Sequence, residues 1–184
     1  MGKSDESRAR LEQAALELYR DRGYTEITAA AIAARAGLTE RTFFRYFADK
    51  RDMLFSGGAA MESAAAEAIA KAEPMSALHL VLIGLHAVAP FFDDRPELVR
   101  ERQRIIDAHA DLQERELTKR AQFTAALGSA LQQRGIDSRT AELTAAIGGV
   151  IFHAAFMRWL RGEAADLDSA ISLSAESVAV LLSE

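Results

Sequence analysis

The chain has 184 residues, of which 49% are hydrophobic and 27% charged, as in an ordinary globular protein. It contains no cysteine, which excludes a disulfide framework, a zinc–thiolate site and a cysteine nucleophile. The formal net charge of the whole chain is -5, which by itself argues against a nucleic-acid partner. With 37 alanines and only 3 prolines, the composition favours an all-α fold, because Ala is the best helix former and Pro the worst.

The sequence shows no pattern of a signal peptide or of a membrane-spanning segment. The first ten residues are charged and lack the apolar core of a signal peptide. The longest apolar stretch, residues 77–92, has 16 residues and includes two histidines and a proline, so it is too short and too polar to span a bilayer. We therefore expect a cytoplasmic protein with no membrane partner.

The charge is unevenly distributed along the chain. Residues 1–52 carry 10 Lys and Arg against 9 Asp and Glu, whereas residues 53–184 carry 12 against 18. Residues 35–51 alone have a net charge of +3. Such asymmetry indicates that the basic part binds a polyanion, so the total charge does not exclude nucleic acid.

The N-terminal part is predicted to form four helices. The apolar spacing of the first follows one helical face, and Gly23 ends it. Thr28, Thr39 and Asp49 are expected to cap the next three. The predicted helices span residues 5–22, 29–36, 40–46 and, without a break, 50–72.

The remainder is predicted to be helical as well, which makes about nine helices in all. Pro90 and Pro96, followed further on by Gly135 and Gly162, mark the breaks. The expected helices span residues 76–89, 96–108, 110–134, 138–161 and 166–183. We place the domain boundary inside the fourth helix, which gives a domain of residues 1–55 and a second of residues 56–184.

The segment from Ile27 to Lys50 has the pattern of two short helices joined at a tight turn that contains Gly37. The expected core positions include Ile32, Phe43 and Phe47. The outer face then carries two arginines, a threonine and two aromatic rings, a composition suited to a DNA groove. Arg41 lies in the first turn of the second helix, where a guanidinium could bind guanine O6 and N7.

This segment resembles the DNA-binding domain of the TetR/AcrR family of bacterial transcription regulators. The resemblance covers roughly residues 8–55 and rests on Gly23, Thr28, Lys50, Leu54 and four runs: residues 14–18, 32–33, 36–39 and 42–47. It implies a helix-turn-helix domain followed by a helical ligand-binding and dimerisation domain. The resemblance implies phosphate contacts from Thr28, Thr42, Tyr46 and Lys50, and base contacts from Glu40, Arg41, Thr42, Phe44 and Arg45. From the residues alone, Thr39 is expected to offer a further hydroxyl to a phosphate oxygen.

Two positions depart from the family pattern. Ala31 stands where an acidic residue often completes a capping box, and Ala30 stands where an arginine can face the bases. Base contacts from the first of the two short helices are therefore in doubt, and Arg41 and Arg45 must contribute more. The alternative for the whole segment is a three-helix bundle without a DNA role.

The helix over residues 140–160 is apolar on nearly all sides, so it needs cover on all sides. Together with the last helix it predicts a four-helix bundle across a two-fold axis, with Gly148 and Gly149 permitting close approach. The alternative is that both helices pack within one subunit. The predicted dimer interface comprises Ile147, Val150, Ile151, Ile171, Ala175, Val178 and Leu182.

Large apolar side chains suggest a pocket for a small hydrophobic or acyl-type effector, although such residues are more often plain core. The acyl assignment rests on a loose similarity of residues 95–117 to family members with acyl-CoA-like ligands. The candidates for the pocket are Phe91, Phe92, Phe123, His153, Phe156, Met157 and Trp159.

Enzymatic motifs are missing. No Glu-x-x-His pair, Gly-rich phosphate loop or nucleophile elbow occurs, so we expect no catalytic residues, no metal site and no cofactor. The sequence thus predicts a homodimeric, ligand-responsive transcriptional regulator that acts as a repressor and binds a palindromic DNA operator. The alternative is a small-molecule-binding helical dimer that recognises no DNA sequence.

Overall fold

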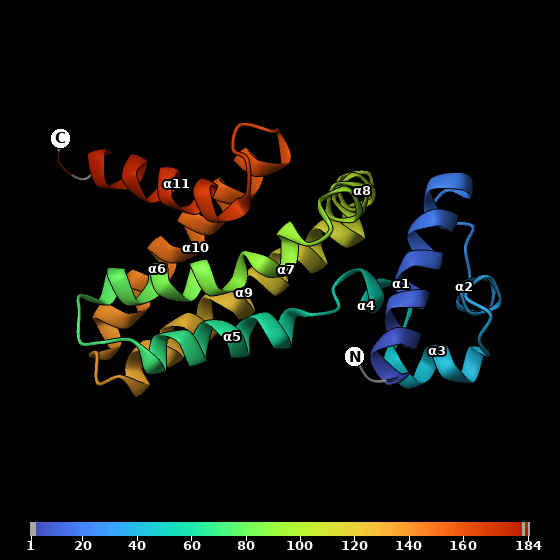
Figure 1. Ribbon diagram of the computed structural model, residues 1–184, viewed down its shortest axis with the longest axis horizontal. Helices are drawn as coiled ribbons and strands as arrows, with labels where there is room; N and C mark the ends of the chain where they lie inside the picture. Colours follow the sequence, from blue (N-terminus) through green and yellow to red (C-terminus); the bar gives the residue numbers. More distant parts are fainter. Residues whose placement is uncertain (1–2, 182, 184) are drawn as a thin grey trace. The chain divides into compact units, whose positions relative to one another are not determined.

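The computed structural model describes residues 3–181 and 183, which form helices joined by turns and contain no strand (Figure 1). The prediction of an all-α fold is confirmed. Leu182, which we expected at the dimer interface, lies outside the described residues. The chain divides into two compact units: an N-terminal unit of Met1–Ser56 with Glu97–Glu116, and a C-terminal unit of Gly57–Pro96 with Leu117–Glu184.

The first helices of the N-terminal unit begin where the sequence predicts. Thr28, Thr39 and Asp49 each accept a hydrogen bond from the backbone N–H three residues on, at 3.2, 3.2 and 2.6 Å. These side chains satisfy N–H groups that have no partner inside the helix. The four helices are α1 (Lys3–Arg22), α2 (Ala29–Arg35), α3 (Glu40–Tyr46) and α4 (Lys50–Leu54).

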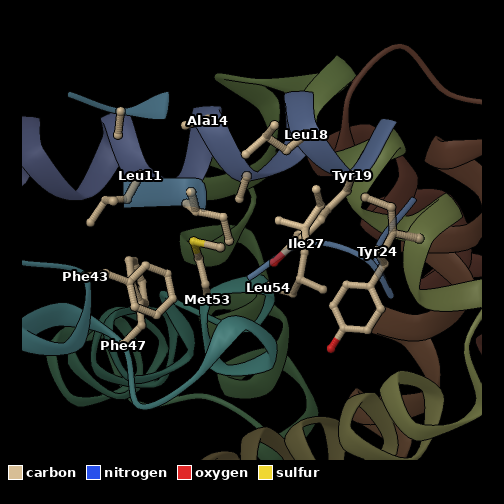
Figure 2. Packing of buried hydrophobic residues seen from close by; sticks show 14 of the residues in the cluster. Leu11, Ala14, Leu18, Tyr19, Tyr24, Ile27, Phe43, Phe47, Met53 and Leu54 are labelled. Atoms are coloured by element: carbon tan, nitrogen blue, oxygen red, sulfur yellow. The ribbon is translucent and has the colours of Figure 1, made fainter. Parts of the chain in front are cut away.

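The core of this unit is built from one apolar face of each helix. Leu11, Ile32 and Phe43 are completely buried, and Phe47 is nearly so. Figure 2 shows Phe43 and Phe47 together on the opposite side of the cluster from α1, with Met53 beside them. The predicted core positions Ile32, Phe43 and Phe47 are confirmed. The same cluster contains Leu18, Ile27, Ala33 and Ala36, with Leu38 partly buried against it.

A segment distant in sequence completes the same core. Helix α8 (Pro96–Asp107) and the first turns of α9 (Ala110–Gln133) belong with the N-terminal unit. Their apolar side chains Ile105, Ile106 and Leu112 join the cluster formed by α1–α4. The helix-turn-helix is therefore supported from outside the first 56 residues.

The prediction of one helix over residues 50–72 is wrong. Helix α4 ends at Leu54, and α5 (Gly58–Lys71) begins after a turn. Gly57 has a φ of +95°, a left-handed conformation that is cheap for glycine and strained for other residues. No continuous helix therefore joins the two halves of the chain at this point.

In the C-terminal unit, α10 (Ser138–Leu160) packs against α6 (Ala77–Val88) and α11 (Leu167–Leu181), and α5 packs against α6. Residues 90–93, expected as a turn, form the short helix α7 (Pro90–Asp93). Helix α10 is long and apolar enough to cross a membrane by length and composition, but these helices bury part of it.

Glycine allows α10 to approach α6 closely. A Cβ atom built on Gly148 would lie 2.3 Å from a methyl carbon of Val81, which is fully buried on α6. The close approach that we predicted at this glycine thus occurs within one chain.

Candidate nucleic-acid interface

The turn between α2 and α3 is short and firmly bonded. Gly37 adopts a φ of +67°, and its N–H donates to the Ala34 carbonyl at 3.0 Å. The Leu38 N–H donates to the Ala33 carbonyl at 2.8 Å. The Arg10 guanidinium on α1 donates to the Ala36 carbonyl at the end of α2. Sequence reasoning missed this contact, which joins residues 26 apart. The turn orients α3 relative to α2 as in a helix-turn-helix.

Helix α3 has a buried side and an exposed side. Phe43 is fully buried, whereas its neighbour Phe44 keeps 53% of its surface exposed. Glu40, Arg41 and Arg45 are exposed as well. The exposed side of α3 thus carries an aromatic ring together with the side chains of two arginines. This exposed side of α3 is the surface that we predicted to face the bases.

Hydroxyl groups lie at the ends of the same helices. The hydroxyls of Thr39 and Thr42 are 2.9 Å apart at the start of α3. The hydroxyl of Tyr46 accepts a hydrogen bond from Arg45 at 2.8 Å, and the guanidinium carbon lies 4.7 Å from the centre of the tyrosine ring. Thr28 is exposed at the start of α2. The structure thus brings the predicted threonines and tyrosine to the ends of α2 and α3.

Lys50 occupies a different environment. Its ammonium nitrogen donates to three backbone carbonyls, those of Tyr24, Thr25 and Ile27, at 2.9, 3.1 and 3.0 Å. Burial lowers the pKa of Lys50, although the carboxylates of Asp111 and Glu26 oppose that shift. The group predicted to contact phosphate therefore already has three acceptors inside the protein.

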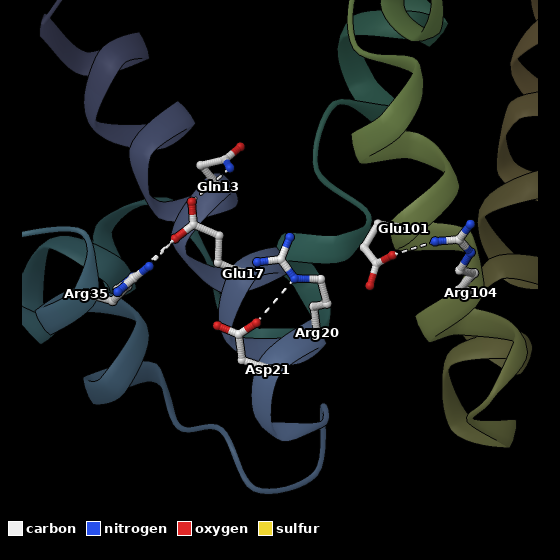
Figure 3. A network of polar contacts seen from close by, with 7 residues as sticks. All are labelled: Gln13, Glu17, Arg20, Asp21, Arg35, Glu101 and Arg104. Atoms are coloured by element: carbon white, nitrogen blue, oxygen red, sulfur yellow. Dashed lines mark hydrogen bonds and ion pairs between the residues drawn. The ribbon is translucent and has the colours of Figure 1, made fainter.

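Polar contacts on the outside of the N-terminal unit join α1 to α2 (Figure 3). Glu17 accepts hydrogen bonds from Gln13 at 3.0 Å and from the Arg35 guanidinium at 2.7 Å, and these contacts lower the pKa of the Glu17 carboxyl. Arg20 pairs with its neighbour Asp21 at 3.2 Å. Arg35 and Arg20 therefore form ion pairs with α1 carboxylates, which reduces the positive charge that they offer to an external anion.

Helix α8 and the first turns of α9 contact the carboxyl end of α4. The guanidinium of Arg102 on α8 donates to the Leu54 carbonyl and lies 5.1 Å from the centre of the Phe55 ring. Burial lowers the pKa of Arg102, opposed by Glu116. Arg115 on α9 pairs with Asp52 of α4 at 3.5 Å. These contacts could not be inferred from spacing, because Arg102 and Leu54 are 48 residues apart and Arg115 and Asp52 are 63 apart.

Aromatic rings meet in the C-terminal unit. Phe156 packs against Phe92 and Trp159, with ring centres 5.4 and 6.0 Å apart. Phe152, which sequence reasoning missed, connects Phe92 with Phe123, although its place one turn before Phe156 was a signal. We call Phe92, Phe123, Phe152, Phe156 and Trp159 the aromatic cluster.

The other pocket candidates lie elsewhere or are more exposed. Phe91 is 46% exposed and takes no part in the ring contacts of the aromatic cluster. Met157 is partly buried on α10, and His153 on the same helix is exposed. The rings of the aromatic cluster contact one another, and those of Phe123, Phe156 and Trp159 are buried.

The residues predicted for a dimer interface fall into two groups. Ile151 and Ile171 are completely buried within the chain, so their side chains belong to its own core. Val150 is 61% exposed, and Ile147, Ala175 and Val178 are partly exposed. Sequence reasoning missed four further exposed side chains on α10 and α11: Leu143, Leu173, Val180 and Leu181.

Comparison with known proteins identifies the helix-turn-helix. Residues 12–56 match the family model described as bacterial regulatory proteins, tetR family. This range contains most of α1 and all of α2, α3 and α4. No curated protein sequence matches the chain.

Solved structures extend the likeness to the whole fold. A TetR-family transcriptional regulator from Syntrophomonas wolfei has a TM-score of 0.63 and 16% identity, covering 99% of this chain and 97% of its own. FadR of Thermus thermophilus, a TetR-family repressor in complex with lauroyl-CoA, has a TM-score of 0.54 and 19% identity, covering 92% and 91%. SmeT in its complex with triclosan has a TM-score of 0.59 and 17% identity, covering 93% and 90%. The N-terminal domain of this chain is therefore that of the tetR family of bacterial regulatory proteins, and the whole chain has the fold of TetR-family regulators.

Proposed function

We propose that the chain is a ligand-responsive, sequence-specific DNA-binding transcriptional regulator, and that it acts as a repressor in the cytoplasm rather than as an enzyme. The observation that carries the proposal is the exposed side of α3. Phe43 anchors the helix from below while Arg41, Phe44 and Arg45 project outward. This is the arrangement with which a recognition helix enters the major groove.

The residues of this face have separable roles in the proposal. Arg41, in the first turn, contacts a guanine, and Phe44 packs on an apolar base edge such as the thymine methyl group. Thr28, Thr39, Thr42 and Tyr46 donate to phosphates, which fixes the register of the helix on the duplex. Glu40 accepts a hydrogen bond from a cytosine amino group, and Arg45 adds positive charge.

A second copy of the chain completes the proposed regulator. One seven-residue helix reads few base pairs, whereas two related by a two-fold axis read a palindrome. Val150, Leu143 and Ile147 follow one another at helical spacing on α10, with Leu173 and Val180 exposed on α11. We assign these exposed side chains to the dimer interface.

The effector proposed is a small hydrophobic or acyl-type molecule bound at the aromatic cluster. FadR of Thermus thermophilus binds lauroyl-CoA and SmeT binds triclosan, and both have this fold. Because these rings contact one another, an effector that binds between them requires them to separate. The effector binds the opened state more tightly than the packed one, and this difference in affinity is what shifts the protein to a state that releases the DNA.

Selection from a random duplex library tests the proposal. Purified protein is incubated with the library, and the retained duplexes are sequenced over several rounds. The proposal predicts an enriched sequence with two-fold symmetry. If no sequence is enriched, the chain is not a sequence-specific regulator, and the alternative of a small-molecule-binding dimer without sequence recognition is favoured.

A further inference from the structure

Helix α7 contributes one ring to the aromatic cluster. The centre of the Phe92 ring lies 6.0 Å from that of Phe152 and 5.4 Å from that of Phe156, both on α10. Its neighbour Phe91 is largely exposed and takes no part in the described ring contacts of the cluster. Of the two phenylalanines of α7, Phe92 therefore joins the helix to the cluster.

The next residue of α7 contacts the first residue of α11. The Asp93 carboxylate accepts a hydrogen bond from the Leu167 N–H at 2.9 Å, across 74 positions of the chain. The N–H groups in the first turn of a helix have no acceptor within that helix. The local carboxylate, Asp166, accepts the N–H of Ser169 at 2.7 Å. Asp93 thus supplies, from another helix, the acceptor for the N–H of Leu167.

A second polar contact joins the start of α11 to α6. His86 Nδ1 lies 2.6 Å from Asp168 Oδ1, and the side chain of Leu167 is fully buried. The start of α11 is therefore fixed at two points. Only the contact with Asp93 comes from a residue directly beside a ring of the aromatic cluster.

The backbones of Phe92 and Asp93 belong to one rigid turn. Their N–H groups donate to the same carbonyl, that of the buried Ala89, at 3.0 and 3.2 Å. Pro90, the first residue of α7, restricts the backbone further, because its ring fixes φ. A movement of this turn that withdraws Phe92 from the cluster therefore also moves Asp93.

We propose that α7 couples the aromatic cluster to the start of α11. When Phe92 is displaced from the cluster, the Asp93 carboxylate withdraws from Leu167 and the first turn of α11 loosens. Because α11 carries Leu173 and Val180 of the proposed dimer surface, the chain then binds a second copy more weakly. An effector that separates the rings thereby also weakens dimerisation. These last two consequences rest on the proposed function, whereas the coupling of Phe92 to Leu167 does not.

Hydrogen exchange of the Leu167 N–H in the unaltered protein is the first test, because it needs no variant that could fail to fold. A first-turn N–H without an acceptor exchanges rapidly, since no hydrogen bond must open. We expect the Leu167 N–H to exchange at least about 10-fold more slowly than an unstructured peptide. If it exchanges as fast as such a peptide, the contact with Asp93 is not formed and the proposal is overturned.

Variants of the two aspartates test the acceptor. Asp93→Ala removes it, whereas Asp93→Asn keeps a carbonyl oxygen at the same place. Asp94→Ala is the matched control, because it makes the same change in charge at the next residue, which is exposed. We expect Asp93→Ala to accelerate exchange of the Leu167 N–H about fivefold, the usual effect of losing a helix cap, and the other two variants to leave it unchanged. An equal acceleration in Asp94→Ala would overturn the proposal.

Variants of the two phenylalanines test the coupling. We expect Phe92→Ala to accelerate exchange at Leu167, and Phe91→Ala, the matched control, to leave it unchanged. The N–H of Ile171, one turn further along α11, is the internal reference, since a general loss of stability accelerates both groups. In the double variant with Asp93→Ala, Phe92→Ala should add nothing at Leu167, because the contact through which it acts is already lost. Additive effects, or an unchanged rate at Leu167 relative to Ile171 in Phe92→Ala, would overturn the coupling.

Sedimentation equilibrium tests the consequence for the dimer. Asp93→Ala and Phe92→Ala should each raise the dissociation constant of the dimer about 10-fold, because both subunits lose the cap of α11. Asp94→Ala should leave it unchanged. Equal dissociation constants for Asp93→Ala and the wild type would show that α7 has no effect on dimerisation. If the wild-type protein is monomeric, the proposed dimer fails, but exchange at Leu167 still decides whether α7 couples the cluster to α11.

Discussion

The close contact between α10 and α6 gives a prediction whose sign is set by distance. In a helix, replacing Gly with Ala stabilises by up to about 1 kcal/mol, because Ala has the better helix propensity. At Gly148 this gain meets a clash, since the new Cβ would lie 2.3 Å from the Val81 methyl carbon. Val81 is fully buried and β-branched, so it has little freedom to move away.

The clash is expected to outweigh the gain. Overpacking a core costs about 1–3 kcal/mol, and more when a stiff side chain must move. We therefore expect Gly148→Ala to lower the free energy of unfolding by a net 1–2 kcal/mol, or about 2–8 °C in Tm for a chain of this size. The assay is thermal and urea unfolding followed by circular dichroism at one fixed protein concentration.

Gly128→Ala is the matched control on α9. There the added Cβ would lie 3.6 Å from that of Ala145, an ordinary contact distance, so the gain in helix propensity remains. We expect this variant to be as stable as the wild type or up to about 1 kcal/mol more stable. If Gly148→Ala is also as stable as the wild type, the packing of α10 on α6 described here is wrong.

Three further predictions concern the proposed dimer, the effector and acid stability. Val150→Asp should weaken dimerisation at least about 100-fold in sedimentation equilibrium, because it buries an unpaired charge at the interface. Val150→Thr, the control, should dimerise far better than Val150→Asp. Equal dimerisation of the two variants would place the interface elsewhere. Phe123→Ala should reduce the ability of lauroyl-CoA to release DNA in an anisotropy titration while leaving DNA affinity within about threefold of the wild type; unchanged release would exclude this ring from the effector site. Asp137→Asn keeps the N-cap of α10 but removes a carboxylate whose pKa is held low by hydrogen bonds from Thr140. A carboxylate whose pKa is lower in the folded than in the unfolded protein stabilises the fold above the unfolded pKa, and this stabilisation is lost as the pH falls through the folded pKa. The wild type should therefore have a higher urea midpoint than this variant at pH 7 and the same midpoint near pH 2. A difference that persists at low pH would contradict the assignment.

Local signals in the sequence predicted much of the N-terminal unit. Thr28, Thr39 and Asp49 cap helices through bonds to residues three positions away, which the sequence places directly. The buried positions of α2 and α3 follow from helical spacing. In contrast, Gly57 was expected inside a helix, although Ser56, Gly57 and Gly58 together are a local turn signal. Gly57 adopts a left-handed conformation, which ends the helix there.

The features that could not be predicted from the sequence are contacts between residues far apart in the chain. The amphipathic pattern of α8 shows that Ile105 and Ile106 need a partner surface, but not that the partner is α1–α4. The charge of Lys50 is visible in the sequence, whereas the three carbonyls around it are brought together by the fold of the preceding loop. Local spacing does not bring these groups together, so the contacts of Lys50 could not be predicted from the sequence.

The most direct test of the account is a map of base preference for the wild type and for Arg41→Ala. Both proteins are put through the same duplex selection, and the base preferences at each position are compared. The account predicts a palindrome for the wild type, and for the variant a loss of about 1–3 kcal/mol of discrimination at one base pair in each half-site, with the other positions retained. Identical preferences for the two proteins would contradict the claim that the exposed side of α3 reads the DNA.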